Sequence, residues 1–215
     1  MQKLTEELVQ AGWAGRVLSQ TQMARLLDGT PQRRYNLVNR ALRHGELLRL
    51  RRGLYLLAPA REGKTPHPFV LAQALQPGSY ISFETALSFH GWIPESAPVT
   101  LSVVPGRRRL ELGPAGLGLF RFVPLALRRG YFMEAVDSVG FGGQTALVAQ
   151  PLRALTDIIC LRRLEAGNVA SLIHSMRIDG ERLMRTRLAA WRALERVYAH
   201  RRVAGAIHEL KETVA

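Results

Sequence analysis

A strongly basic helix-and-hairpin pattern near the start of the chain constrains the fold more than any other feature. Between residues 29 and 59 the sequence reads GTPQRRYNLVNRALRHGELLRLRRGLYLLAP, which holds seven arginines, one histidine and a single acid, Glu46. Thr30 can cap a helix and Pro31 suits its first position. Apolar residues then recur at i, i+1, i+4 and i+5 along residues 32–44. This spacing predicts a helix with one buried side and one basic side.

The segments on either side of this helix complete a recognisable unit. Ser19 can cap a shorter helix over residues 20–27, which precedes the basic helix. Two short apolar segments, 47–50 and 54–57, follow it and flank a turn at Gly53, where glycine supplies the backbone freedom that a tight hairpin needs. Helix, turn, second helix and two-stranded hairpin is the order of a winged helix-turn-helix.

We therefore predict an α+β protein in which a winged helix-turn-helix precedes a mixed α/β domain and a helical basic tail. A polar joint rich in Pro and Gly at residues 58–66 is typical of a linker, and a softer break falls at residues 166–168. The predicted domains are a DNA-binding domain over residues 1–60, an α/β domain over residues 66–165 and a helical basic extension over residues 166–215.

The middle of the chain mixes strand and helix signals. Ser82 is placed to cap a helix over residues 83–90, and Pro151 opens an apolar-periodic helix. In the tail, Leu188, Trp191, Leu194 and Tyr198 share one stripe while arginines fill the other sides. The predicted strands lie at residues 100–104, 118–123, 131–136 and 145–149.

The charge of the chain indicates a polyanionic partner. Thirty basic and 17 acidic residues give a net charge of +13, and 27 of the basic residues are arginines. By region the net charge is +7 for residues 1–65, +2 for residues 66–165 and +4 for residues 166–215. Such an excess suits nucleic acid or an anionic membrane surface. More than half of it lies in the predicted DNA-binding domain.

Signals for a membrane or an oxidising compartment are weak. The longest uncharged stretch, residues 65–83, contains three prolines and does not predict a membrane span. No signal peptide is apparent in the first twenty residues. One cysteine, Cys160, lies in an apolar stretch, which favours a buried thiol and a reducing cytoplasm.

Catalytic and cofactor motifs are not apparent in the sequence. Gly140-Phe141-Gly142-Gly143 lacks the third glycine of a dinucleotide fingerprint and the lysine of a phosphate-binding loop, so we interpret it as a loop between strands. Ser82, Glu84 and His90 are not framed as a hydrolytic triad. We expect no metal, no cofactor and no enzymatic activity.

The predicted DNA contacts come from the basic side of the second helix and from the hairpin. Arginine, asparagine and glutamine side chains present paired hydrogen-bonding groups that match guanine and adenine edges in the major groove. Hairpin arginines would lie against phosphates or reach into a minor groove. The candidate residues are Gln32, Arg33, Arg34, Asn36, Asn39, Arg40, Arg43, Arg49, Arg51 and Arg52.

Three further segments resemble a known family. Arg51-Arg52-Gly53-Leu54-Tyr55, the segment YISFETALSFHG at residues 80–91 and the segment AQPLRALTDII at residues 149–159 follow one another in the chain. The third is similar to a proline-led pattern, Pro-x-Arg/Lys-Ala-Leu-x-Asp. Together these segments resemble the AbiEi family of antitoxins over roughly residues 19 to 163.

The resemblance implies a transcriptional regulator that represses its own operon by binding inverted repeats at the promoter. It also implies the antitoxin of a type IV toxin–antitoxin system, which counters a nucleotidyltransferase-like toxin without forming a stable complex with it. In that family the C-terminal domain is tied to antitoxicity and to cooperative assembly on DNA, so self-association on DNA is expected. The tail after residue 166 matches no family motif.

Two other functions stay open. The arginine-rich tail suits an adaptor that neutralises an acidic partner protein by direct binding. A nucleic-acid-processing enzyme with a winged-helix targeting domain is the third, although clustered carboxylates are lacking. The turn Arg107-Arg108-Arg109 is either an exposed basic turn or a further contact to phosphates or a partner.

Overall fold

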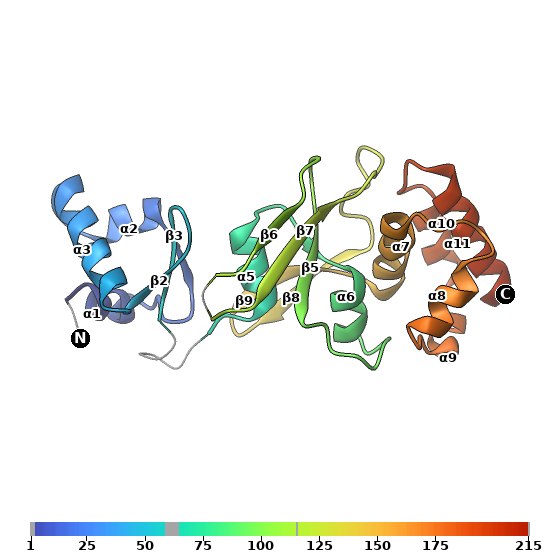
Figure 1. Ribbon diagram of the computed structural model, residues 1–215, viewed down its shortest axis with the longest axis horizontal. Coiled ribbons are helices and arrows are strands. Elements are labelled where there is room, and N and C mark those ends of the chain that lie inside the picture. Colours follow the sequence, from blue (N-terminus) through green and yellow to red (C-terminus); the bar gives the residue numbers. More distant parts are fainter. Residues whose placement is uncertain (1–2, 59–64, 115, 215) are drawn as a thin grey trace. The chain divides into compact units, whose positions relative to one another are not determined.

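The computed structural model describes residues 3–58, 65–114 and 116–214, and it is a mixed α+β protein (Figure 1). These residues contain ten helices, a three-stranded antiparallel sheet and a six-stranded mixed sheet. Two compact units result. The N-terminal unit comprises Met1–Leu75 with Gly113–Gly118, and the C-terminal unit comprises Gln76–Leu112 with Leu119–Ala215.

The three predicted domains stay a prediction about which parts fold separately. Most of the predicted linker at residues 58–66 lies outside the described residues. Residues 166–214 belong to the same compact unit as the strands and helices of the predicted α/β domain.

The N-terminal unit is built from helices around a small sheet in the strand order β1-β3-β2. The bounds of the two predicted helices and the hairpin agree with the structure to within one residue at most ends. The helix α1 and the strand β1 were not predicted. In chain order the elements are α1 (Lys3–Gln10), β1 (Val17–Ser19), α2 (Gln20–Leu26), α3 (Pro31–Arg43), β2 (Leu47–Arg51), β3 (Leu54–Leu57) and α5 (Pro68–Leu75).

Local capping explains why α2 and α3 begin where they do. The Ser19 hydroxyl accepts a hydrogen bond from the Gln22 backbone N–H at 3.2 Å, and the Gln22 side chain accepts one from the Ser19 N–H at 2.8 Å. This reciprocal pair is a capping box. At α3, the Thr30 hydroxyl accepts from the Arg33 N–H at 3.3 Å, and Pro31 occupies the first turn. Both predicted caps are confirmed.

Glu46, the one acid of the basic segment at residues 29–59, is buried in the core of this unit. Leu4 and Leu8 of α1 pack with buried residues of α2, α3 and the sheet. Beside them the Thr5 hydroxyl donates a hydrogen bond to the Glu46 carboxylate, and both side chains are buried. Glu46 therefore lies in the core of the unit and not on the exposed surface of α3.

The C-terminal unit contains the six-stranded sheet, in the order β6-β7-β5-β4-β9-β8. The pairs β5–β7 and β4–β9 are parallel, and the other three pairs are antiparallel. The strands are β4 (Tyr80–Ile81), β5 (Val99–Val104), β6 (Leu110–Leu112), β7 (Leu119–Pro124), β8 (Val136–Phe141) and β9 (Gln144–Ala149).

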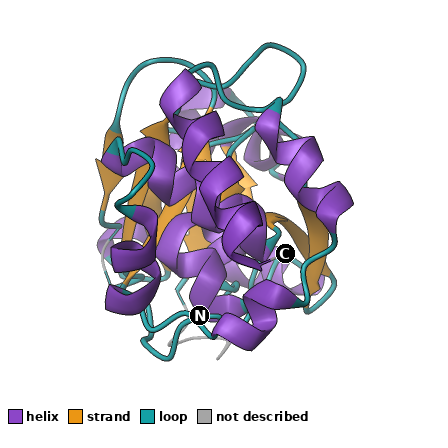
Figure 2. Ribbon diagram, turned by 90° about the vertical axis from the view of Figure 1, so that its right-hand side faces the viewer, coloured by secondary structure: helices purple, strands orange, loops and turns teal. Residues whose placement is uncertain are grey.

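Helices from the end of the chain gather beside this sheet. In Figure 2, which views the molecule from the side of these helices, the strands lie behind them. The helix α7 carries a continuous run of buried residues from Leu152 to Cys160, and α10 and α11 pack against it. The helices are α6 (Phe83–Phe89), α7 (Pro151–Arg162), α8 (Val169–Ser175), α9 (Gly180–Met184), α10 (Leu188–Glu195) and α11 (Arg201–Val214).

One prediction for this region is wrong, and another holds only in part. The segment 131–136 is not a strand: residues 132–135 form a turn in which Ala135 has φ of +53°, and β8 begins only at Val136. Ser82 occupies the N-cap position of α6, as predicted, but its hydroxyl makes no capping hydrogen bond to the helix. Its hydroxyl instead donates to the Asp157 carboxylate at 2.7 Å, a partner distant in sequence that no local pattern reveals.

Candidate nucleic-acid interface

The basic side of α3 is exposed, as its apolar spacing predicts. Leu37, Val38, Ala41 and Leu42 pack into or against the core of the N-terminal unit. The hairpin carries Arg49, Arg51 and Arg52, and α3 carries the other seven candidates, of which Arg34 lies one turn before Val38 on the side that faces the core. Arg34 and Asn39 are half-buried, and the exposed ones are Gln32, Arg33, Asn36, Arg40, Arg43, Arg49, Arg51 and Arg52.

These side chains form few hydrogen bonds and ion pairs within the described residues. The Gln32 side-chain amide donates to the Asn36 side-chain oxygen Oδ1 at 3.3 Å along the helix, and the Arg34 guanidinium donates to the Gly29 backbone carbonyl at 2.6 Å. Within the described ranges, none of the seven candidate arginines forms an ion pair with an acid. The surface therefore presents positive charge that the protein itself does not neutralise.

The hairpin holds its arginines at a defined place. In the β2–β3 pair, Arg49 lies opposite Tyr55 and Arg51 opposite Leu54, with a register shift between the two arginines. Gly53 has φ of +76°, which an L side chain rarely adopts. Its carbonyl accepts a hydrogen bond from the Gln20 N–H at 2.8 Å. The hairpin tip is thereby tied to the start of α2.

One pocket brings three of the candidates together and adds residues that sequence reasoning missed. A hollow of about 230 Å³ lies between α2, α3 and the hairpin, and its lining includes Arg34, Asn39 and Arg49. Gln20 and Tyr35 line it too, and the Tyr35 side chain is 65% exposed. The signal was present in the sequence, since Tyr35 precedes Asn39 by one helical turn.

Arg33 is separated from this group. It lines a different hollow, on the side of α3 that faces α1, together with Glu7 and Asp28. The predicted basic face therefore has two different sides. The side toward α1 has acids near Arg33, whereas the hollow toward the hairpin has no acid in its lining.

The C-terminal unit contains a second, entirely different polar cluster. The Asp157 carboxylate accepts hydrogen bonds from Arg153 at 3.1 Å, Tyr198 at 2.7 Å, Tyr80 at 3.0 Å and Ser82 at 2.7 Å. All five side chains are buried. The Arg153 guanidinium also donates to the Tyr80 hydroxyl at 2.7 Å and to the Glu134 carbonyl at 2.9 Å.

The pKa values in this cluster are shifted by burial and by the charges of neighbouring side chains. Burial, followed by the charge of Asp157, raises the pKa of the Tyr80 and Tyr198 hydroxyls well above their ordinary value. Burial disfavours the charged form of Arg153, but Asp157 and the two tyrosines outweigh it, so the pKa of Arg153 is raised. Perturbed pKa values can mark active sites. Here every partner is internal and solvent is excluded, so the cluster holds the unit together.

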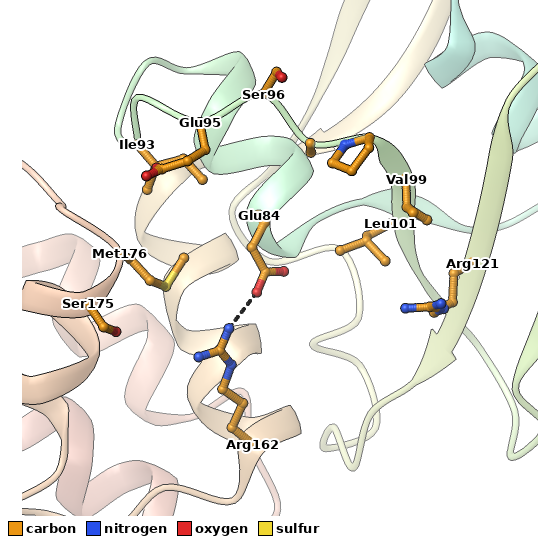
Figure 3. Close-up of a pocket in the computed structure, with 12 residues that line it drawn as sticks. Glu84, Ile93, Glu95, Ser96, Val99, Leu101, Arg121, Arg162, Ser175 and Met176 are labelled. Carbon is orange, nitrogen blue, oxygen red and sulfur yellow. Dashed lines mark hydrogen bonds and ion pairs between the residues drawn. The ribbon is translucent and has the colours of Figure 1, made fainter.

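An open pocket with mixed apolar and charged lining lies in the C-terminal unit (Figure 3). Its volume is about 450 Å³, and Figure 3 shows Arg162 and Glu84 pointing toward each other in its wall, with an ion pair at 2.8 Å. Arg121 also lines it and pairs with Glu111 at 2.7 Å. Glu84, Arg162 and Arg121, which line this pocket, are therefore each already in an ion pair.

The remaining reactive side chains have structural surroundings. His90 ends α6, where its ring nitrogen Nε2 lies 3.0 Å from the Ala149 carbonyl oxygen, and burial lowers the pKa of His90. Burial raises the pKa of the Cys160 thiol to about 11. Across the described segments no three His, Cys, Asp or Glu side chains are grouped so as to hold a metal ion. No helix of the described segments is both long and apolar enough to cross a bilayer.

Comparison with known proteins does not assign this chain to a family. No family model matches the sequence, and no curated protein matches it. Among solved structures, the crystal structure of the RV2827C protein from Mycobacterium tuberculosis is similar, with 14% identity and a TM-score of 0.47. That likeness covers 97% of this chain and 77% of the other.

Proposed function

We propose that this chain is a DNA-binding transcriptional repressor whose N-terminal unit is a winged helix-turn-helix. The observation that carries the proposal is the face of α3 and the hairpin, where exposed arginine and amide side chains lack acidic partners. Glu46, the one acid of this segment, is buried against Thr5. An uncompensated face of this kind suits a polyanion.

The dimensions and chemistry of α3 favour duplex DNA as that polyanion. A helix with its side chains is about 10–12 Å across, and the major groove of B-DNA is about 12 Å wide. Asn36, Asn39 and Arg40 share the outward side of α3 and carry the groups that pair with adenine and guanine edges. With α3 in the groove, Arg51 and Arg52 at the hairpin tip contact the sugar-phosphate backbone.

The wider biological role rests on the sequence resemblance to the AbiEi antitoxins. On that basis the repressor binds inverted repeats in the promoter of its own operon, self-associates on this DNA, and acts as a type IV antitoxin. Its toxin would be a nucleotidyltransferase-like protein that it counters without a stable complex. Its place of action would be the cytoplasm, without enzymatic activity, cofactor or metal.

The proposal is tested with the full chain and a duplex that covers its own promoter. We expect the wild-type chain to bind this duplex more tightly than a scrambled duplex of the same length and composition. The double variant Asn39→Ala/Arg40→Ala should lose most of that preference while keeping its melting temperature. Arg121→Ala, which removes an exposed arginine of the C-terminal unit, is the control and should keep the preference.

Two outcomes would reject parts of the proposal. Equal affinity of the wild-type chain for both duplexes would remove the repressor function. A stable complex of this chain with the neighbouring toxin at moderate salt would instead support the adaptor that binds an acidic protein.

A further inference from the structure

A second arginine surface lies in the C-terminal unit, away from every residue used in the proposed function. It is assembled by backbone pairing between two segments distant in sequence. The Arg128 N–H donates to the Val197 carbonyl at 2.7 Å, and the Ala199 N–H donates to the Ala126 carbonyl at 2.9 Å. Leu127 and Tyr198 form an antiparallel bridge between these bonds. The turn after β7 is therefore held against the α10–α11 connection.

This pairing places four arginines on two adjacent backbone segments. Arg129 and Arg196 are the next residues outward from the Arg128–Val197 bond, and Arg192 lies one turn before Arg196 on α10. A hollow of about 360 Å³ is lined by Arg192 and Arg196. We call Arg128, Arg129, Arg192 and Arg196 the arginine cluster, and all four are exposed.

The charge of the cluster is barely compensated. Of the residues that the structure describes, no acid forms an ion pair with any of the four arginines. One carboxylate, that of Glu134, lies in the lining of the same hollow. Some other exposed arginines of this unit are paired, namely Arg121 with Glu111, Arg162 with Glu84, and Arg185 with Glu181. Single exposed arginines such as Arg163, Arg187 and Arg201 form no ion pair within the described residues either, so the cluster is distinguished by the number of arginines on two paired segments.

The neighbouring sheet edge adds positive charge. Strands β5 and β7 are parallel, with Val104 beside Pro124 at their carboxyl ends. The loops that follow them extend beyond the same end of the sheet in Figure 1. One of these loops carries the exposed residues 107–109, all arginine, and the other carries Arg128 and Arg129.

We propose that the arginine cluster is a second nucleic-acid contact, which binds the phosphate backbone of duplex DNA without reading its sequence. Guanidinium groups match phosphate oxygens in a bidentate manner. Tyr131 is the one aromatic residue in the lining of the hollow, and it is half-buried, so the cluster offers little exposed ring surface on which single-stranded bases would stack. Its residues contain no amide side chain for adenine. The chemistry is therefore that of backbone contacts, which position a protein on a duplex.

The test uses the full chain and a 40-base-pair duplex of arbitrary sequence. The quadruple variant Arg128→Gln/Arg129→Gln/Arg192→Gln/Arg196→Gln is compared with wild type by fluorescence anisotropy over a range of salt concentrations. Each phosphate contact contributes about 0.9 to the slope of log K against log salt. We expect the slope to fall by up to about 3.6 and the affinity at moderate salt to drop on the order of tenfold or more.

A control variant matches the change in charge. Replacing Arg121, Arg162, Arg177 and Arg185 with glutamine also removes four exposed positive charges, but from side chains that are paired with acids. This control should keep nearly the wild-type slope. An equal loss in both variants would show that only the total charge matters, and it would overturn the proposal.

The same measurements separate this proposal from the proposed function. The variant Asn39→Ala/Arg40→Ala should lose preference for the promoter yet still show the slope difference caused by the arginine cluster. An unchanged slope in the cluster variant would overturn the second contact and leave the role of α3 standing. A loss of affinity for a 40-nucleotide single-stranded RNA alone, with duplex binding intact, would also overturn it.

Discussion

The arginines of α3 and the hairpin differ from Arg153 of the C-terminal unit in their exposure and in their pairing. On α3 and the hairpin of the N-terminal unit, guanidinium groups are exposed and have no acidic partner. In the C-terminal unit, Arg153 is fully buried and bonds Asp157, Tyr80 and two backbone carbonyls. A buried charge costs stability unless it is paired, whereas an exposed unpaired charge is available to a partner. The contrast predicts that substitutions in the buried Arg153–Asp157 pair affect folding, whereas substitutions of exposed, unpaired arginines affect binding.

The largest expected effect comes from breaking the buried pair. Asp157→Ala leaves the Arg153 charge buried without its carboxylate and removes the acceptor of Tyr80, Ser82 and Tyr198. Loss of one partner of a buried pair costs about 3–5 kcal/mol. Thermal and urea unfolding should show a correspondingly lower free energy of unfolding. The exposed pair provides the control: Glu111→Gln should cost less than about 1 kcal/mol.

The contrast would fail if Asp157→Ala unfolded like wild type. That result would mean that the cluster contributes little to stability, and its perturbed tyrosines would then need a functional explanation.

A smaller effect, on binding alone, is expected on α3. Arg40→Ala should reduce discrimination between the promoter and a scrambled duplex by about 1–3 kcal/mol, the contribution of one good base contact. Its melting temperature should stay close to that of wild type because the side chain is exposed and unpaired. Competition binding with the two duplexes measures the first quantity. Unchanged discrimination would place the base contacts elsewhere.

The hairpin should show a weaker and less selective effect. Arg52→Ala removes one backbone contact, so binding to all duplexes should weaken alike and the salt slope should fall by about 1. A salt titration with promoter and scrambled duplexes checks both points. Should Arg52→Ala change the preference between duplexes, the hairpin would be reading sequence.

The smallest effect concerns pH and His90. Burial lowers the pKa of His90, so the unfolded chain takes up a proton at a higher pH than the folded chain. Stability from this residue is complete above the unfolded value of 6.5 and is lost as the pH falls through the lower folded value. Unfolding midpoints at pH 8 and pH 5.5 should therefore differ more for wild type than for His90→Gln. An identical pH response would assign the dependence to other groups.

Sequence patterns were reliable where short-range interactions decide the structure. The helix starts at α2 and α3 depend on Ser19, Thr30 and Pro31, each of which acts within three residues of its own position. The hairpin depends on Gly53, whose backbone conformation is a property of glycine itself. These local rules predicted the exposed basic face of α3 as well, because helical spacing alone separates its apolar side from its polar side.

Prediction failed where a distant partner decides the outcome. Ser82 satisfies every local requirement of a cap, yet Asp157 takes its hydroxyl from 75 residues away. The segment 131–136 has strand-forming residues, but it turns before β8 begins, and Arg153 binds the Tyr131 and Glu134 carbonyls there. The arginine cluster likewise depends on the pairing of residues 126–128 with 197–199, for which no pattern in either segment is a guide.

By itself the sequence determined the mixed α+β character, the basic helix with its hairpin and the excess of positive charge, since these follow from composition, helical spacing and capping. Only the tertiary structure decided which charged side chains are buried and paired within the molecule and which are exposed at its surface. Glu46 and Asp157 are both acids near arginines in the sequence, but one is buried against Thr5 and the other against Arg153. Burial and pairing depend on contacts between residues far apart in the chain, and these form only when the whole chain packs.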